Sequence, residues 1–224
     1  MLHLPKIIKN LTMALVIGIV SQKGGVGKST LSRLLAVEYA RNEYAVKVAD
    51  MDLSQGTVSE WNRTRMSRDV TPLVSVEQFN SLNEAIKQDK NYDLIIFDGA
   101  PHATRMTLDI ALRSDFVIMP TGVTLDDLRP TIRLAHEFVS KGIPADKIGI
   151  VLSRVGASAN EINGAKRYIT EGGYFVLGTL PEKTSIGQAH DIGKAANETA
   201  FKTINDSVDE LIQSIVNRIS DIQN

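Results

Sequence analysis

A glycine-rich segment at residues 21–30, Ser-Gln-Lys-Gly-Gly-Val-Gly-Lys-Ser-Thr, carries the residues with the clearest chemistry in this chain. It follows an apolar run at Leu15–Val20 and precedes a helix-like run, so a strand, a loop and a helix are expected in that order. Glycines let the backbone turn its N–H groups toward an anion, and the N-terminal end of the helix attracts the same anion. The segment therefore predicts a loop that binds the phosphates of a nucleotide.

Individual positions in this loop have separate expected roles. Lys28 is placed to reach the β- and γ-phosphates of a nucleotide, and the Ser29 hydroxyl is placed to ligate Mg²⁺. The general motif has a glycine five residues before Gly27, where this chain has Gln22, and a second lysine, Lys23, follows it. The residues expected to bind the nucleotide here are Lys23, Gly24, Gly25, Val26, Gly27, Lys28, Ser29 and Thr30.

Two further strand-like runs end in carboxylates. Asp50 and Asp52 close one of them, and their side chains point the same way if the strand geometry continues. Asp98 ends the apolar run Leu94–Asp98. Because ligands collect at the carboxyl ends of parallel strands, we expect these acids beside the phosphate loop, where they suit a magnesium–nucleotide site.

Short apolar runs alternate with helix-like segments along the chain. This alternation predicts the α/β class, with a mostly parallel twisted sheet of about seven strands and helices on both faces. The expected strands are Leu15–Val20, Ala45–Asp50, Leu73–Val76, Leu94–Asp98, Phe116–Pro120, Ile148–Ser153 and Phe175–Leu180. The expected helices are Ser29–Asn42, Thr57–Arg68, Gln78–Gln88, Thr104–Ser114, Leu125–Lys141, Ala159–Glu171 and Asn197–Ile222.

Length and composition fit one domain. The chain has 224 residues, 43% of them hydrophobic, and a net charge of −1, so nothing in the overall charge attracts nucleic acid. It has no cysteines, which excludes disulfides and cysteine-ligated metal sites. We expect a single domain at residues 13–224, an N-terminal extension at residues 1–12, and either Met1 or Met13 as the natural start. No stretch approaches the roughly 20 apolar residues of a membrane span, so a cytoplasmic protein is expected.

The motifs resemble those of the ParA/MinD family of deviant Walker-A ATPases, which have the P-loop NTPase fold. The resemblance rests on the loop at Lys23–Ser29, on Asp50-Met51-Asp52 and on Asp98-Gly99-Ala100-Pro101, in this order. It covers nearly the whole chain from Leu15. The chain is most similar to the small ParF-like plasmid-partition ATPases, which lack an N-terminal helix-turn-helix domain.

This resemblance implies roles for single residues. In the family the early lysine, here Lys23, reaches the partner's nucleotide in a dimer that ATP holds together. The resemblance implies catalytic roles for Lys23, Lys28 and Asp52, with Asp52 positioning the hydrolytic water. It implies Mg²⁺ ligation by Ser29, Asp52 and Asp98, and contact with adenine by Ser153, Arg154 and Pro181.

The chain also departs from the family pattern at two of these positions. The segment Asp52-Leu53-Ser54-Gln55 has one residue more than the Asp-Pro-Gln that is usual in the family, so its loop has a different geometry. Ser153 stands where the family often has an asparagine that reads adenine.

The implied function is plasmid partition. ATP and Mg²⁺ would join two subunits into a homodimer that binds DNA non-specifically on the nucleoid, and a ParB-like centromere-binding partner would stimulate a weak ATPase. The basic residues available for DNA are Arg63, Arg65, Arg68, Lys166, Arg167, Lys194 and Lys202. The alternatives are a positioning ATPase for another cargo, such as a conjugation factor or a protein cluster, and an ATP-dependent synthetase or kinase on the same fold.

The last helix separates two branches of the family. Its apolar residues recur at helical spacing, which predicts a face packed against the domain. MinD-like relatives end in a basic amphipathic helix that binds membranes, whereas the last seven residues here contain a single basic residue, Arg218. No membrane partner is therefore expected.

Overall fold

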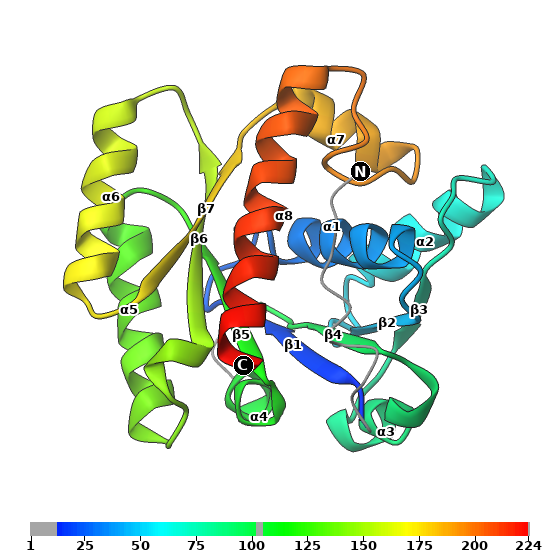
Figure 1. Ribbon diagram of the computed structural model, residues 1–224, viewed down its shortest axis with the longest axis horizontal. Coiled ribbons are helices and arrows are strands. Elements are labelled where there is room, and N and C mark those ends of the chain that lie inside the picture. The colour runs from blue at the N-terminus through cyan, green and yellow to red at the C-terminus, as the bar shows by residue number, and fades with distance from the viewer. Residues whose placement is uncertain (1–12, 102–104, 224) are drawn as a thin grey trace.

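Seven parallel strands form one sheet at the centre of the molecule (Figure 1). The computed structural model describes residues 13–101 and 105–223. Its strands follow the order β3-β2-β4-β1-β5-β6-β7. They are β1 (Leu15–Ile19), β2 (Val46–Asp50), β3 (Ser75–Gln78), β4 (Leu94–Asp98), β5 (Phe116–Thr121), β6 (Ile148–Val155) and β7 (Phe175–Pro181). All seven expected strands are present, and the predicted α/β class with a parallel sheet is confirmed.

Helices follow most of the strands, as the alternating pattern predicts. The α-helices of the described residues are α1 (Lys28–Arg41), α2 (Thr57–Ser67), α3 (Leu82–Ile86), α4 (Arg105–Arg113), α5 (Leu125–Ser140), α6 (Ala159–Glu171), α7 (Thr184–Asp191) and α8 (Lys202–Gln223). Two short 3-10 helices, η2 (Asp89–Asn91) and η3 (Ala145–Lys147), precede β4 and β6. The expected extension at residues 1–12 and the expected helix start at Thr104 lie outside the described residues.

Some expected boundaries are wrong for identifiable reasons. The third strand begins at Ser75, and α3 begins at Leu82 instead of Gln78, because Gln78 pairs with Asp50 of β2 as the last residue of β3. The last helix begins at Lys202 instead of Asn197. The residues between these positions form local hydrogen bonds, among them one from Thr199 Oγ1 to Asn205 Oδ1 at 2.7 Å.

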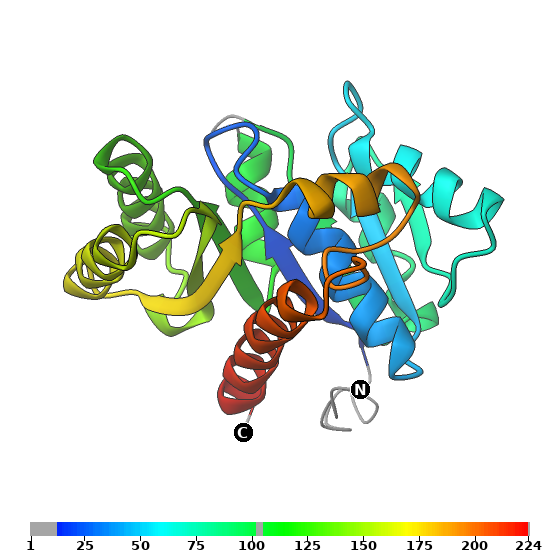
Figure 2. The same ribbon diagram turned by 90° about the horizontal axis from the view of Figure 1, so that it is seen from above.

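The helices cover both faces of the sheet, and each face has its own apolar core (Figure 2). Helices α1, α2, α7 and α8 cover one face, and α3, α4, α5 and α6 cover the other. The central strand β4 supplies both cores alternately, with Leu94 and Ile96 in the first and Ile95 and Phe97 in the second. This is the side-chain alternation of a strand buried on both faces.

Helix α8 is an integral part of the first core. Its buried residues are the six apolar positions predicted from helical spacing, Val208, Leu211, Ile212, Ile215, Val216 and Ile219. The helix packs closely on β7, where a Cβ at Gly178 would lie 2.9 Å from Leu211 Cδ1. Within the described residues, no helix is long and apolar enough to cross a membrane.

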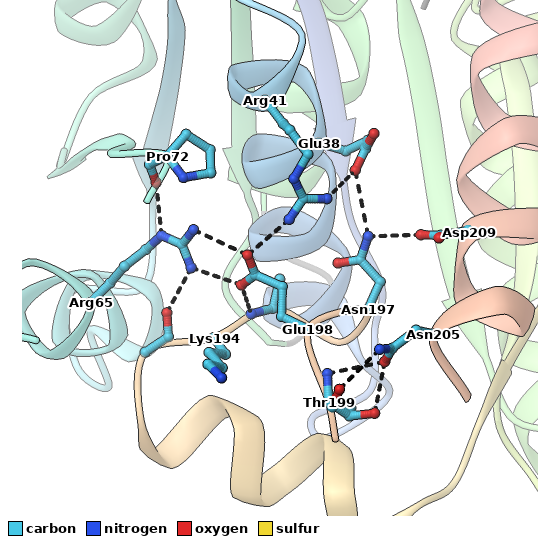
Figure 3. Close-up of polar contacts among 12 residues, drawn as sticks. Glu38, Arg41, Arg65, Pro72, Lys194, Asn197, Glu198, Thr199, Asn205 and Asp209 are labelled. Atoms are coloured by element: carbon cyan, nitrogen blue, oxygen red, sulfur yellow. Dashed lines mark hydrogen bonds and ion pairs between the residues drawn. The ribbon is translucent and has the colours of Figure 1, made fainter. Parts of the chain in front are cut away.

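A buried polar network joins α1, α2 and the segment between α7 and α8 (Figure 3). Arg65 of α2 is fully buried and donates hydrogen bonds from its two terminal nitrogens to the Glu198 carboxylate at 2.8 and 3.3 Å. Arg41 of α1 donates to the same carboxylate at 2.8 Å. Burial alone favours the neutral acid, but the hydrogen bond from Arg65 and the neighbouring charges hold the pKa of Glu198 below its usual range.

The network corrects one expectation about DNA. The sequence groups Arg63, Arg65 and Arg68 as one basic cluster, but Arg65 is enclosed in the protein and already neutralised by Glu198, so this prediction is wrong for Arg65. Arg63 is exposed and pairs with Glu60 of its own helix at 3.0 Å. The α2 helix therefore offers DNA less free positive charge than the sequence indicates.

Candidate functional site

The glycine-rich loop connects the carboxyl end of β1 to the first residue of α1. Gly25 and Gly27 have φ angles of +71° and +95°, a left-handed conformation that residues with a side chain rarely adopt. A Cβ at Gly27 would lie 3.1 Å from Ser153 Oγ of β6. The loop is therefore packed tightly against β6 at the N-terminal end of α1.

A pocket of about 360 Å³ opens in front of this loop. Its volume lies within the range of about 300–1,000 Å³ that is usual for small-molecule sites. It brings together most of the predicted site residues, namely Gly24, Gly25, Gly27, Lys28, Ser29, Thr30, Asp52, Asp98, Arg154 and Pro181. The three others lie near it: Lys23 and Val26 within the loop, and Ser153 beneath Gly27.

Lys28 places a buried ammonium group in the pocket. Its Nζ atom donates a hydrogen bond to the backbone carbonyl oxygen of Lys23 at 3.2 Å. Burial lowers the pKa of Lys28, and the carboxylates of Asp98 and Asp52 oppose this effect. Since the bonded partner is a neutral carbonyl, a phosphate in the pocket would give Lys28 a stronger, charge-assisted hydrogen bond.

Asp98 and Ser29 form the oxygen-rich side of the pocket. The Asp98 carboxylate accepts hydrogen bonds from Ser29 Oγ and Ser32 Oγ, both at 2.8 Å. Burial raises the pKa of Asp98 to about 6, although the two serine hydrogen bonds favour its charged form. A serine hydroxyl and a carboxylate are hard oxygen donors that suit Mg²⁺, with the phosphates as its other ligands. Ser29 and Asp98 therefore fit a magnesium ion.

Asp50 and Asp52 have different surroundings, although the sequence groups them. Asp50 is fully buried, and its Oδ2 accepts hydrogen bonds from Ser59 Oγ at 2.9 Å and Ser59 N at 3.1 Å. Asp52 lines the pocket, and its Oδ1 accepts from Ser54 Oγ at 2.6 Å and Gln55 N at 3.1 Å. The two carboxylates therefore have separate surroundings: Asp50 holds the first turn of α2, and Asp52, the predicted site residue, lines the pocket.

Lys23 is tied to a distant helix. Its Nζ atom lies 2.6 Å from Asp127 Oδ1, in the first turn of α5. Burial alone favours the neutral form of Asp127, but hydrogen bonds from Lys23 and Thr124 hold the pKa of its carboxyl below the usual range. The Lys23 side chain remains 41% exposed. It therefore lies at the surface, bonded to α5.

The ends of β6 and β7 form the wall opposite the loop. Arg154 lines the pocket with a left-handed φ of +56° and donates to Glu182 Oε1 from Nε at 3.0 Å and Nη2 at 2.9 Å. Pro181 lines the pocket beside them. Ser153 is buried against Gly27, and its hydroxyl has no hydrogen-bond partner among the described residues. Arg154 and Pro181 are therefore better placed than Ser153 to meet a bound base.

Sequence reasoning misses several pocket residues, among them two with titratable side chains deep in the pocket wall, Arg33 and His190. Arg33 of α1 lines the pocket and donates to the Thr57 carbonyl oxygen at 2.7 Å. His190 comes from α7, which the sequence does not predict, and burial together with the charge of Arg33 lowers its pKa to about 4. The spacing of buried Ile186 and Ala189 in α7 is the sequence signal that indicates this helix.

The described part of the pocket does not have the set of protein ligands that would hold a metal ion without a bound nucleotide. Within the part of the chain that the structure describes, no cluster of three or more His, Cys, Asp or Glu side chains is placed to hold a metal ion.

Comparisons with known proteins found similar sequences and similar folds. Protein ParA of Rhizobium radiobacter is 30% identical over 106 residues, and the chain spans about half of that relative, 47% of its length. The septum site-determining protein MinD of Pyrococcus horikoshii OT3, complexed with Mg-ADP, has a TM-score of 0.73 and 19% identity, covering 95% of this chain and 99% of that one. A ParA family ATPase of Chlorobium tepidum TLS has a TM-score of 0.64 and 17% identity, covering 92% and 98%.

The two structural likenesses show a shared fold. A family model, described as the CobQ/CobB/MinD/ParA nucleotide binding domain, matches residues 17–196. That range contains the glycine-rich loop, both carboxylate strands and the pocket wall at β6, β7 and α7. The chain therefore belongs to the ParA/MinD family of nucleotide-binding proteins.

Proposed function

We propose that this protein is an ATPase that dimerises through its nucleotide, binds DNA non-specifically and partitions plasmid DNA with a ParB-like partner. The proposal places the protein in the cytoplasm, on the nucleoid. The observation that carries it is the position of Lys23. Its carbonyl supports Lys28 inside the pocket, while its side chain lies partly exposed at the surface and is bonded to α5. A lysine so placed is available to a nucleotide held by a second subunit.

Within one subunit, the loop and its neighbours account for nucleotide binding. The loop N–H groups and Lys28 bind the phosphates, and Ser29, Asp98 and Asp52 hold Mg²⁺. A magnesium ion held by these residues would supply charge neutralisation at the phosphates. Arg154 and Pro181 contact the base, with Ser153 supporting the loop from below.

Asp52 supplies the catalytic function in this proposal. Its carboxylate now accepts hydrogen bonds from Ser54 and Gln55, so it is engaged by its own exposed loop. All of these bonds go to Oδ1, and Oδ2 accepts none among the described residues, so in this proposal Oδ2 is the atom that orients the attacking water.

An ATPase assay tests the proposal most directly. The full chain is assayed with ATP and Mg²⁺ alone, with DNA, with a candidate ParB-like protein encoded beside it, and with both. We expect weak basal hydrolysis and the greatest stimulation when both are present. Lys28→Ala, which removes the buried ammonium group, serves as the inactive control.

Other outcomes discriminate among the alternatives. Strong stimulation by a small metabolite, with no response to DNA, would support a synthetase or kinase instead of a partition ATPase. Stimulation by a partner protein without any DNA requirement would support the positioning of another cargo. Absence of hydrolysis under all four conditions contradicts the ATPase proposal itself.

A further inference from the structure

The nucleotide pocket extends beyond the phosphate loop to a part that α1 and α7 border. Arg33 of α1 and His190 of α7 line the pocket there, and we call this part the α1–α7 corner. Arg33 follows Ser29 by four residues and Thr30 by three, so it lies on the same side of α1, one turn further from the loop. Helix α7 begins shortly after Pro181 and continues the pocket wall as far as His190.

Two contacts fix the Arg33 side chain in this corner. Its Nη2 atom donates a hydrogen bond to the Thr57 carbonyl oxygen at 2.7 Å, and its Cζ atom lies 5.6 Å from the centroid of the Trp61 ring. The residue is only 6% exposed. Burial lowers the pKa of Arg33 to about 10, and the carboxylates of Asp98 and Asp50 oppose this effect. Arg33 is therefore a positively charged donor in a fixed position at neutral pH.

Each residue of the corner has one buried nitrogen without a partner. Arg33 Nε and His190 Nε2 are both buried and form no hydrogen bond within the described residues. Buried polar atoms nearly always have a hydrogen-bond partner. Two unpaired nitrogens on residues that line one pocket therefore indicate a bound group that the chain itself does not supply.

The two nitrogens restrict the chemistry of that group. Arg33 Nε only donates, whereas a neutral imidazole has one donor nitrogen and one acceptor nitrogen. Burial and the charge of Arg33 lower the pKa of His190 to about 4, so His190 is neutral at pH 7. A hydroxyl group donates and accepts, so it can pair with Arg33 Nε and with either tautomer of His190. A phosphate oxygen only accepts, so it suits only one of the two tautomers.

The corner lies where a nucleotide carries its hydroxyl groups. In the proposed function the phosphates bind at the N-terminal end of α1, and the base contacts Arg154 and Pro181. The ribose joins these two parts of the nucleotide and has two adjacent hydroxyls. The corner is one turn of α1, about 5.4 Å, beyond the phosphate end, and α7 connects it to the wall that contacts the base.

We propose that Arg33 and His190 bind the ribose hydroxyls of the nucleotide and make this protein select ribonucleotides over deoxyribonucleotides, an inference that rests on the proposed function. A nucleotide that lacks one of these hydroxyls leaves a buried nitrogen unpaired, and an unpaired buried polar group lowers affinity. Because Thr57 and Trp61 already hold Arg33 in place, binding the sugar requires little ordering of this side chain.

Binding of ADP and its deoxy analogues tests the proposal. The full chain is titrated with ADP, 2′-deoxyADP and 3′-deoxyADP by calorimetry in the presence of Mg²⁺, since ADP avoids both hydrolysis and dimerisation by ATP. Arg33→Met and His190→Phe keep apolar bulk and remove the hydrogen-bonding groups. His136→Phe is the control, because His136 bonds to Tyr174 from α5, outside the pocket. Thermal unfolding shows whether each variant is folded.

We expect wild type to bind ADP at least about fivefold more tightly than one or both deoxy analogues. In Arg33→Met and His190→Phe this ratio should fall toward one, because the variants lose affinity for ADP but not for the analogue that lacks the matching hydroxyl. His136→Phe should keep the wild-type ratio. The ratio compares ligands on the same protein, so a general loss of stability does not change it.

Three outcomes contradict the proposal in different ways. Equal affinity of wild type for all three nucleotides overturns the ribose assignment while the proposed function stands, and a buried water would then pair with the two nitrogens. A wild-type preference that both variants retain, even with weaker binding overall, gives Arg33 and His190 another role and also overturns the assignment. If wild type binds none of the three nucleotides, the proposed function fails together with the inference.

Discussion

Lys23 Nζ and Asp127 Oδ1 lie 2.6 Å apart, although 104 residues separate them in the chain. The pair connects the nucleotide loop, which follows β1, to the first turn of α5, which follows the neighbouring strand β5. In the proposed dimer Lys23 must reach the partner's nucleotide, so this contact within one subunit competes with dimerisation. The competition has a testable direction.

Substitutions at the two ends of this pair should have opposite effects. Lys23→Ala removes the group that acts across the dimer, so ATP-dependent dimerisation should be lost. Asp127→Asn frees Lys23, and since both side chains are partly exposed, each pair is worth less than about 1 kcal/mol, so the two pairs of a dimer correspond to dimerisation up to about thirtyfold stronger. Light scattering with and without ATP measures both. Weaker dimerisation of Asp127→Asn would contradict this competition.

The two aspartates at the carboxyl end of β2, Asp50 and Asp52, should separate catalysis from stability. Asp52→Ala should bind ATP but not hydrolyse it, with a Tm near that of wild type, because its hydrogen bonds lie in an exposed loop. Asp50→Asn should lower the free energy of unfolding by about 1–3 kcal/mol, because Asp50 is fully buried on Ser59. Nucleotide binding, turnover and thermal unfolding are measured for both. An Asp52→Ala protein with normal turnover would exclude the catalytic role.

Loss of Glu198 should destabilise the whole domain. Glu198→Gln leaves the fully buried Arg65 guanidinium without a counter-charge, which costs about 3–5 kcal/mol when a buried pair is broken. Lys202→Gln is the matched control, because its pair with Asp206 is exposed and contributes about 0–1 kcal/mol. Urea unfolding compares the variants. Similar losses in both would mean that the network does not stabilise the fold.

His190 should make stability depend on pH. Burial lowers its pKa from 6.5 to about 4, so as the pH falls the unfolded chain takes up this proton before the folded one. Stability from this group is complete above pH 6.5 and is lost as the pH falls toward about 4, with a loss of about 2 kcal/mol at pH 5. His190→Gln should therefore have a flatter stability profile between pH 7 and about 4. Parallel profiles for the two proteins would refute the assignment.

Much of the fold is predictable because its signals are local. Buried parallel strands are nearly continuous apolar runs, so the central strands are predicted close to their observed bounds, whereas β3, which is only partly buried, is predicted two residues too early. Helix α7 was missed because it is short, contains Gly187, and buries only Ile186 and Ala189. The starts of α3 and α8 were misplaced because strand pairing and local hydrogen bonds, which have no periodic signature, override helical tendency there.

The candidate site also has a part that local sequence predicts and a part that depends on the folded chain. The loop residues follow from one contiguous motif, and most of them meet in one pocket. The partners of Asp50, Lys23 and Arg65 could not be predicted, because each contact depends on segments that meet only in the folded chain. The sequence does not show which arginines are buried, and only the folded structure distinguishes buried Arg65 from exposed Arg63.

The Glu198 network has a consequence for synthesis on the ribosome. Arg65 leaves the ribosome 133 residues before the carboxylate that neutralises it, and Arg41 leaves 157 residues before it. Because an uncompensated buried cation is costly, we expect α2 to dock only after Glu198 has emerged. Translation should therefore deliver a nascent chain whose nucleotide pocket, bordered by α2 and α7, closes only after Glu198 has emerged.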